Sequence, residues 1–143
     1  MRPSFALHGR LAQDSMLITE LTLCQARLLN DRRYPWVILV PMRPDIFEVH
    51  QLSTAEQQQL IAESSQVSQV LEDQFKPDSI NVAALGNVVS QLHWHVVARK
   101  QDDPAWPGPI WGVGTAEPYS DNEAHALIEW LAQAIGEQHK PSQ

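Results

Sequence analysis

The sequence has one cysteine, little positive charge and no long apolar run. A lone thiol, Cys24, cannot form an internal disulfide, so the 143-residue chain is not a disulfide-stapled scaffold. No stretch approaches the ~20 apolar residues of a membrane helix. Residues Met1–Phe5 carry a charge but are not followed by the apolar run of a signal peptide. We therefore expect a cytoplasmic protein with no membrane partner.

The balance of charge is acidic. Lys and Arg number 10 against 17 Asp and Glu, which gives a formal net charge of −7 with histidine neutral. This argues against a nucleic-acid polymer as partner, because binding to such polymers rests on Lys and Arg. It leaves open a small phosphorylated ligand, which needs only a local site. The length and the 43% hydrophobic content predict a single folded domain over residues 1–143.

Two capping boxes mark the start of two helices. Ser53–Glu56 begins the first, and Pro77 stops it because proline disfavours helix in the residue before it. Ser120–Glu123 begins the second, which Gly136 can end. Apolar residues follow each box at helical spacing. The chain thus predicts two main helices, the second over about residues 121–136.

Between the helices, apolar and polar residues alternate with period two, as in strands. Strands are expected over 36–40, closed by a proline, over 80–84 and over 92–96, while 16–30 fits either a strand or a helix. Residues 101–118 hold four prolines and two tryptophans, which could close over a site or be buried packing. Short turns join the strands, which favours an α+β fold with an antiparallel sheet.

The segment Ser90–Arg99 contains the most informative pattern. On a strand, Gln91, His93 and His95 would share one face, the two histidines about 6.7 Å apart, while the residues between them face the core. A neutral imidazole is a nucleophile that can form a covalent intermediate. Its neighbour, protonated at a modestly raised pKa, can donate to a phosphate or a leaving group. A turn over Gly86–Ser90 could present backbone amides to an anion.

Two other interpretations of the histidine pair stay open at this point. Histidines that alternate on a solvated strand face are often simple surface residues. A His-x-His pair can also supply two zinc ligands. A zinc site would need a third ligand, which Cys24, His50 or an acid would have to supply, and the sequence has no second close-spaced ligand pair.

The same segment resembles a known family signature. Gln91–Val97 is similar to the His-φ-His-φ-His-φ-φ motif (φ apolar) of the histidine triad (HIT) family. Val37–Pro41 resembles that family's strand ending in Val-Ile-Pro, Asn30–Asp31 lies where the family has an acid, and Gly86–Val89 resembles its Gly-Gln-Ser/Thr-Val. The resemblance covers about residues 5–112. It looks closest to a bacterial branch with Gln-φ-His-φ-His, preceded by Ala-Leu-Gly-Asn and followed by Trp-Pro-Gly-Pro-φ-Trp.

The resemblance implies a fold and a chemistry. The fold is α+β with a five-stranded antiparallel sheet, commonly in a homodimer whose sheets join. The activity is hydrolysis or transfer of a nucleotide, from a phosphoramidate or a dinucleotide polyphosphate, by attack of a histidine on the α-phosphate. A nucleotidyl-histidine intermediate forms, and water or another acceptor then takes the nucleotide from it. No resident cofactor is implied, although a divalent metal could accompany the nucleotide.

The motif also implies roles for individual residues. His93 would be the nucleophile, His95 the donor to the phosphate and leaving group, and Gln91 the remaining triad position. Asp31 matches the acid that binds the ribose hydroxyls, and Leu29 an apolar wall of the base pocket. The phosphate-proximal positions are Asn81, Asn87 and the backbone amide of Val89.

Three departures from the family pattern bear on activity. Gln91 replaces the first histidine and cannot titrate near neutrality, although it can form hydrogen bonds. Val88 replaces a hydroxyl-bearing residue near the phosphates, and the loop from Asp31 to Pro41 is short. The sequence therefore supports an enzyme, with a nucleotide-binding protein of little or no turnover as the alternative.

Overall fold

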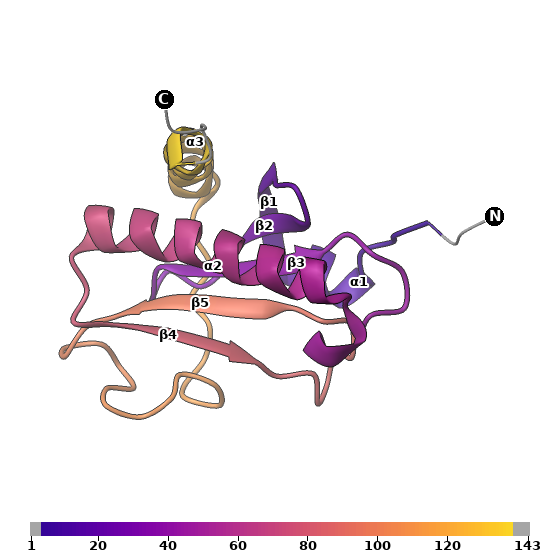
Figure 1. Ribbon diagram of the computed structural model, residues 1–143. Helices are drawn as coiled ribbons and strands as arrows, with labels where there is room; N and C mark the ends of the chain where they lie inside the picture. Colours follow the sequence, from indigo (N-terminus) through magenta and orange to yellow (C-terminus); the bar gives the residue numbers. More distant parts are fainter. Residues whose placement is uncertain (1–3, 139–143) are drawn as a thin grey trace.

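The computed structural model describes residues 4–138 and contains one five-stranded antiparallel sheet. Its strands lie side by side in the order β1-β2-β3-β5-β4, which leaves β1 and β4 at the edges (Figure 1). The strands are β1 (Ser15–Glu20), β2 (Cys24–Leu29), β3 (Trp36–Pro41), β4 (Ser79–Ala84) and β5 (Trp94–Arg99). The α+β class with a five-stranded antiparallel sheet is thus confirmed. The predicted domain of residues 1–143 includes 1–3 and 139–143, which lie outside the described residues.

Two long helices begin at the predicted capping boxes. They are α2 (Thr54–Phe75) and α3 (Asp121–Gln138), and the shorter ones are α1 (Gly9–Asp14) and the 3-10 turn η1 (Val49–Gln51). The Ser53 hydroxyl accepts from the Glu56 amide and the Glu56 carboxylate accepts from the Ser53 amide. The expected end of α3 at Gly136 is wrong, because the helix continues to Gln138. Glycine inside a helix costs only about 1 kcal/mol relative to alanine, so it need not end one.

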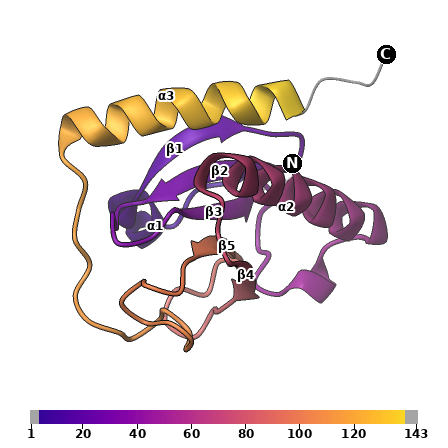
Figure 2. The same cartoon turned by 90° about the vertical axis from the view of Figure 1, so that its left-hand side faces the viewer.

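The helices α2 and α3 cover one face of the sheet, and chain segments mostly without regular structure, together with Leu11 of α1, cover the other (Figures 1 and 2). A large apolar cluster fills the space under the helices. A second cluster lies on the opposite face, where Phe5 and Leu7 of the N-terminal segment and Ile110 and Trp111 pack against the sheet. This second face carries the predicted site.

The central strand β3 is buried on both faces. Val37 and Leu39 belong to the cluster under the helices, whereas Trp36 and Ile38 belong to the cluster on the opposite face. A continuous apolar run of this kind predicts burial but does not reveal which residues face which side. The structure therefore adds Trp36 to the face that carries the histidines.

The chain differs from the expected strands in three places. β5 begins at Trp94, so Gln91–His93 precede the strand. The ambiguous residues 16–30 form most of β1 and β2, and α1 was not predicted. No helix among residues 4–138 is long and apolar enough to span a membrane.

Candidate active site

His93 and His95 lie together on the face opposite the long helices. Their ring centroids are 5.0 Å apart, and the two residues are only 8% and 5% exposed. Between them, Trp94 points to the other face, where its indole N–H donates to the Ser64 hydroxyl of α2 at 2.9 Å. This burial removes the simple interpretation of the pair as solvated surface residues.

A backbone carbonyl fixes the proton on His93. The Nδ1 atom lies 2.7 Å from the carbonyl oxygen of Gln91. A carbonyl can only accept, so Nδ1 must carry the hydrogen. In the neutral ring, Nε2 then holds the lone pair, which is the form of imidazole that can attack an electrophile.

An indole fixes the opposite tautomer on His95. The Trp36 Nε1–H donates to Nδ1 of His95 at 2.9 Å. An indole N–H can only donate, so Nδ1 is unprotonated and Nε2 carries the hydrogen of the neutral ring. Burial, together with the neighbouring His93, lowers the pKa of His95 to about 3. The expectation of a modestly raised pKa is therefore wrong for this residue, which is a neutral donor at physiological pH.

The loop between β4 and β5 supplies free backbone amides. Within the described part of the chain, the amides of Asn87, Val88, Val89 and Ser90 donate no hydrogen bond. The Val89 side chain is buried in the cluster below, which anchors this loop, whereas Asn87 is exposed. Consecutive unpaired amides of this kind suit an anion.

Asn81 lies beside the histidines on the neighbouring strand. It pairs with Val97 across β4 and β5, and Ala83 pairs with His95, so Asn81 is one step along the same face. Its Oδ1 accepts from Arg99 Nη1 at 2.7 Å. Arg99 is 2% exposed and is held by a salt bridge to Asp103 at 2.7 Å.

A cavity of about 430 Å³ adjoins His95 through two tryptophans. Trp36 and Trp111 line it, and their ring centroids lie 5.7 and 5.1 Å from that of His95. Leu29 and Asp31 also line it, so the two residues expected at a ribose and base pocket share one cavity.

The Asp31 carboxylate is already occupied. Both of its oxygens accept from the Arg33 guanidinium, at distances down to 2.8 Å, and Oδ1 also accepts from the Glu117 amide at 3.3 Å. Gly114 has a φ of 62°, and a Cβ there would lie 2.8 Å from Arg33 Nη1, so glycine allows this close approach. The Asp31 side chain is only 2% exposed. A ribose would reach it only after Arg33 had moved.

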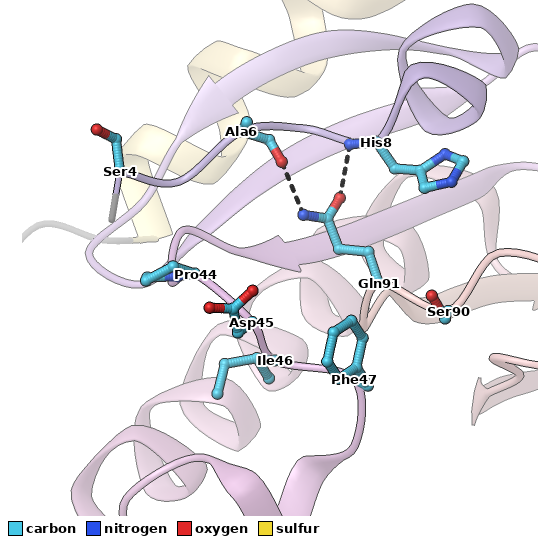
Figure 3. Close-up of a pocket in the computed structure, with 9 residues that line it drawn as sticks. All are labelled: Ser4, Ala6, His8, Pro44, Asp45, Ile46, Phe47, Ser90 and Gln91. Atoms are coloured by element: carbon cyan, nitrogen blue, oxygen red, sulfur yellow. Dashed lines mark hydrogen bonds between the residues drawn. The ribbon is translucent and has the colours of Figure 1, made fainter. Parts of the chain in front are cut away.

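The Gln91 side chain is hydrogen-bonded to the N-terminal segment (Figure 3). Its Nε2 donates to the Ala6 carbonyl at 2.9 Å, and its Oε1 accepts from the His8 amide at 2.8 Å. Ser90 and Phe47 lie beside it around a cavity of about 250 Å³.

The structure does not assemble the zinc site that the sequence left open. Cys24 is buried in the cluster under the helices, on the other side of the sheet from His93 and His95. His50 is exposed in η1. Among residues 4–138, no three histidine, cysteine or acidic side chains gather in a way that could hold a metal ion.

Sequence reasoning missed the residues that act on the site from a distance. The sequence places Trp36 at the start of an expected strand, and it gives Arg33 and the Ala6–His8 segment no role. Trp36 and the Ala6–His8 segment meet their partners across the fold, so no local pattern singles them out, whereas Arg33 and Asp31 are only two residues apart and that spacing was a usable signal. The tryptophans of 101–118 gave a second usable signal, and Trp111 does contact His95.

The comparisons with known proteins concern the family and the fold. The family model described as HIT domain matches residues 10–102. A histidine triad protein from Bradyrhizobium japonicum is 42% identical, with a TM-score of 0.90 over 93% of this chain and 99% of that one. One from Marinobacter aquaeolei VT8 is 45% identical, with a TM-score of 0.90 over 96% and 100%. One from Sinorhizobium meliloti 1021 is 47% identical, with a TM-score of 0.86 over 94% and 96%. The search of curated proteins found no match.

Proposed function

This chain belongs to the HIT domain family, and on that premise we propose that it is a nucleotidyl hydrolase or transferase that cleaves at the α-phosphate of a nucleotide. The substrate class is a nucleoside phosphoramidate or a dinucleotide polyphosphate. His93 is the nucleophile and His95 the hydrogen-bond donor to the phosphate.

The observation that carries this proposal is the pair of opposite tautomers. His93 is held with a lone pair on Nε2 by the Gln91 carbonyl, and His95 is held with a hydrogen on Nε2 by Trp36. One ring therefore offers a nucleophile and the other a donor. Phosphoryl chemistry needs this combination of attack and charge stabilisation.

The reaction proceeds in two steps. The Nε2 lone pair of His93 attacks the α-phosphorus, an N–P bond forms, and the bond to the leaving group breaks with its electron pair on that group. The leaving group takes up a proton from solvent. Water or another acceptor then attacks phosphorus, returns its proton to solvent, and breaks the N–P bond to release the nucleotide and restore the lone pair on Nε2 of His93. The Nε2–H of His95 and the free amides of Asn87–Ser90 stabilise the phosphate charge.

The remaining predicted residues take supporting positions in this proposal. Leu29 and the tryptophan pair, Trp36 and Trp111, line the cavity that would receive the base. Asn81, oriented by Arg99, lies on the strand next to the histidines. The same proposal includes a homodimer through β4, which is an edge strand, and light scattering tests it. It also includes a divalent cation that enters with the nucleotide, and a chelator tests this.

Turnover of a defined panel tests the function. We expect the protein to cleave at least one of the adenosine and guanosine 5′-phosphoramidates and dinucleotide polyphosphates, and His93→Ala to lower the rate by roughly a thousandfold or more. His125→Ala is the control, because this histidine is exposed on α3. If the wild type cleaves nothing but binds a mononucleotide, the protein is a binder and the enzyme proposal is wrong.

A further inference from the structure

The side chain of Gln91 joins two backbone groups that belong to a different part of the chain. Ala6 and His8 are 85 and 83 residues away in sequence. The amide nitrogen donates to one and the amide oxygen accepts from the other, as Figure 3 shows with its two dashed lines. The carboxamide thus replaces the backbone partner that an extended segment would find in a sheet.

This contact depends on the chemistry of an amide. Glutamine carries a donor and an acceptor on one carbon, directed to the same side, so it can serve an adjacent C=O and N–H together. The ring nitrogens of histidine diverge from each other, and a histidine at residue 91 could not form both hydrogen bonds in this geometry. Glutamine, which stands where the triad has its first histidine, therefore makes a contact that a histidine could not make.

The backbone of the same residue holds the nucleophile. The Gln91 carbonyl is the acceptor for Nδ1–H of His93, at 2.7 Å. Gln91 lies before β5, so the strand does not fix its carbonyl; the Leu92 N–H of the same peptide group donates to the Ile46 carbonyl at 3.0 Å, and the side-chain contact is a second constraint. Phe5 and Leu7, on either side of Ala6, pack into the cluster on this face of the sheet and dock the N-terminal segment. The docked segment holds the side chain of Gln91, and the backbone carbonyl of Gln91 holds His93.

We propose that Gln91 is a positioning residue, which uses the docked N-terminal segment to keep His93 in the Nδ1–H tautomer. The catalytic benefit rests on the proposed function, but the tautomer itself does not. When the contact is lost, only the Leu92 N–H bond still holds this peptide group, so the Gln91 carbonyl moves away from Nδ1 in a fraction of molecules, and in that fraction His93 populates the Nε2–H tautomer. That tautomer has no lone pair on Nε2 and cannot attack.

A backbone substitution at residue 8 tests this with little other change. His8→Pro removes the N–H that binds Gln91 Oε1, and the native φ of −55° at this exposed residue suits proline. His8→Ala is the matched control, because both variants lose the side-chain contact to the Arg10 amide and only alanine keeps the N–H. The readout is the tautomer of His93, measured by ¹⁵N NMR on the full-length protein without ligand.

We expect the wild type and His8→Ala to show His93 in the Nδ1–H form, and His8→Pro to show a clear Nε2–H fraction. Gln91→Met, which keeps the length but loses both hydrogen bonds, should show the larger fraction. With an adenosine 5′-phosphoramidate that the wild type cleaves, kcat should fall by about three- to tenfold in both variants while KM stays constant. Gln91→His should lower kcat as well.

Two results would overturn the positioning role. One is a wild-type tautomer in folded His8→Pro and Gln91→Met. The other is an equal change in His8→Pro and His8→Ala, which would assign the effect to the side chain of His8. Folding is checked by circular dichroism and thermal unfolding. Because the tautomer is read without substrate, a protein that cleaves nothing can still pass or fail this test, so the two proposals fail separately.

Discussion

At the scale of single residues, the site is defined by what each histidine nitrogen faces. Nδ1 of His93 faces a carbonyl, and Nδ1 of His95 faces an indole N–H. The sequence predicts the two imidazoles and their proximity, because their spacing is local. It does not predict their tautomers, because Trp36 reaches His95 across 59 residues of chain.

Replacing Trp36 with phenylalanine tests the control of His95. Phenylalanine keeps an aromatic ring in the cluster but removes the donor to Nδ1. We therefore expect the pKa of His95 to rise from about 3 and the Nδ1–H tautomer to become populated beside the Nε2–H tautomer. ¹⁵N NMR across a pH titration measures both. An unchanged pKa and an unchanged tautomer would show that the indole does not control His95.

The same pKa predicts how stability depends on pH. His95 has a lower pKa in the folded protein than the ordinary value of 6.5 in the unfolded chain, so the unfolded chain binds more protons between these values. The free energy of unfolding is therefore highest above pH 6.5 and falls as the pH decreases toward 3, by on the order of 5 kcal/mol in total. We measure the free energy of unfolding by urea at several pH values from 7 to 4.5. It should fall less steeply with decreasing pH in His95→Gln than in the wild type. Equal slopes would contradict the assignment.

Asp31 is expected to stabilise the fold rather than to recognise ribose. Burial alone would raise its pKa, but the hydrogen bonds from Arg33 and the Glu117 amide outweigh this and lower the pKa of the carboxyl. We expect Asp31→Asn to cost about 3 kcal/mol, because it takes the charged partner from the half-buried Arg33 guanidinium. Arg32→Ala, which breaks an exposed pair with Glu117, should cost less than 1 kcal/mol.

Substrate discrimination separates the two roles of Asp31. With an adenosine 5′-phosphoramidate and its 2′,3′-dideoxy analogue, we expect kcat/KM of the wild type to differ by less than about threefold, since a 1.4 kcal/mol contact would give tenfold. A tenfold preference for the ribose form that disappears in Asp31→Asn would restore the ribose-binding role implied by the family resemblance.

At the scale of elements, a buried carboxylate joins α2 to the sheet. Glu63 is fully buried, and its oxygens accept from the amides of Leu23 and Cys24 at 2.8 and 2.9 Å. These amides lie at the start of β2 and have no strand partner there. Burial and the neighbouring Glu63 raise the pKa of the Cys24 thiol, which keeps it protonated.

Glu63→Ala should therefore destabilise the protein strongly. It leaves two buried N–H groups without acceptors, and we expect a loss of about 2–5 kcal/mol in the free energy of unfolding by urea. Glu72→Ala on the same helix is the control, because Glu72 is exposed, and it should change stability by less than about 0.5 kcal/mol. Similar losses in the two variants would show that the link from α2 to β2 carries no special weight.

Elements with local signals could be predicted from sequence, and elements that depend on partners could not. The capping boxes at Ser53 and Ser120 fix the starts of α2 and α3 through contacts three residues apart. Residues 16–30 have apolar spacing that fits both a helix and a strand, and pairing of β2 with β3 decides between them. β5 begins two residues later than its alternation indicates, since its paired partner on β4 ends at Ala84, opposite Trp94.

At the scale of the whole molecule, the two faces of the sheet serve different purposes. The helices α2 and α3 bury one face and supply the main core (Figure 2). The other face carries His93 and His95 under the N-terminal segment and the segment that follows β5. Arg99 fastens the segment after β5 through Asp103 and the Gly108 carbonyl. Long-range contacts of this kind complete the site, which explains why the sequence predicted its centre and missed its surroundings.

The central claim is that His93 becomes covalently nucleotidylated. Mixing the protein with an adenosine 5′-phosphoramidate, quenching within one turnover and measuring intact mass should reveal an adenylyl adduct. Peptide mapping should place that adduct on His93, and it should be absent in His93→Ala. Turnover of the substrate with no adduct at any quench time, or an adduct that persists in His93→Ala, would contradict the account.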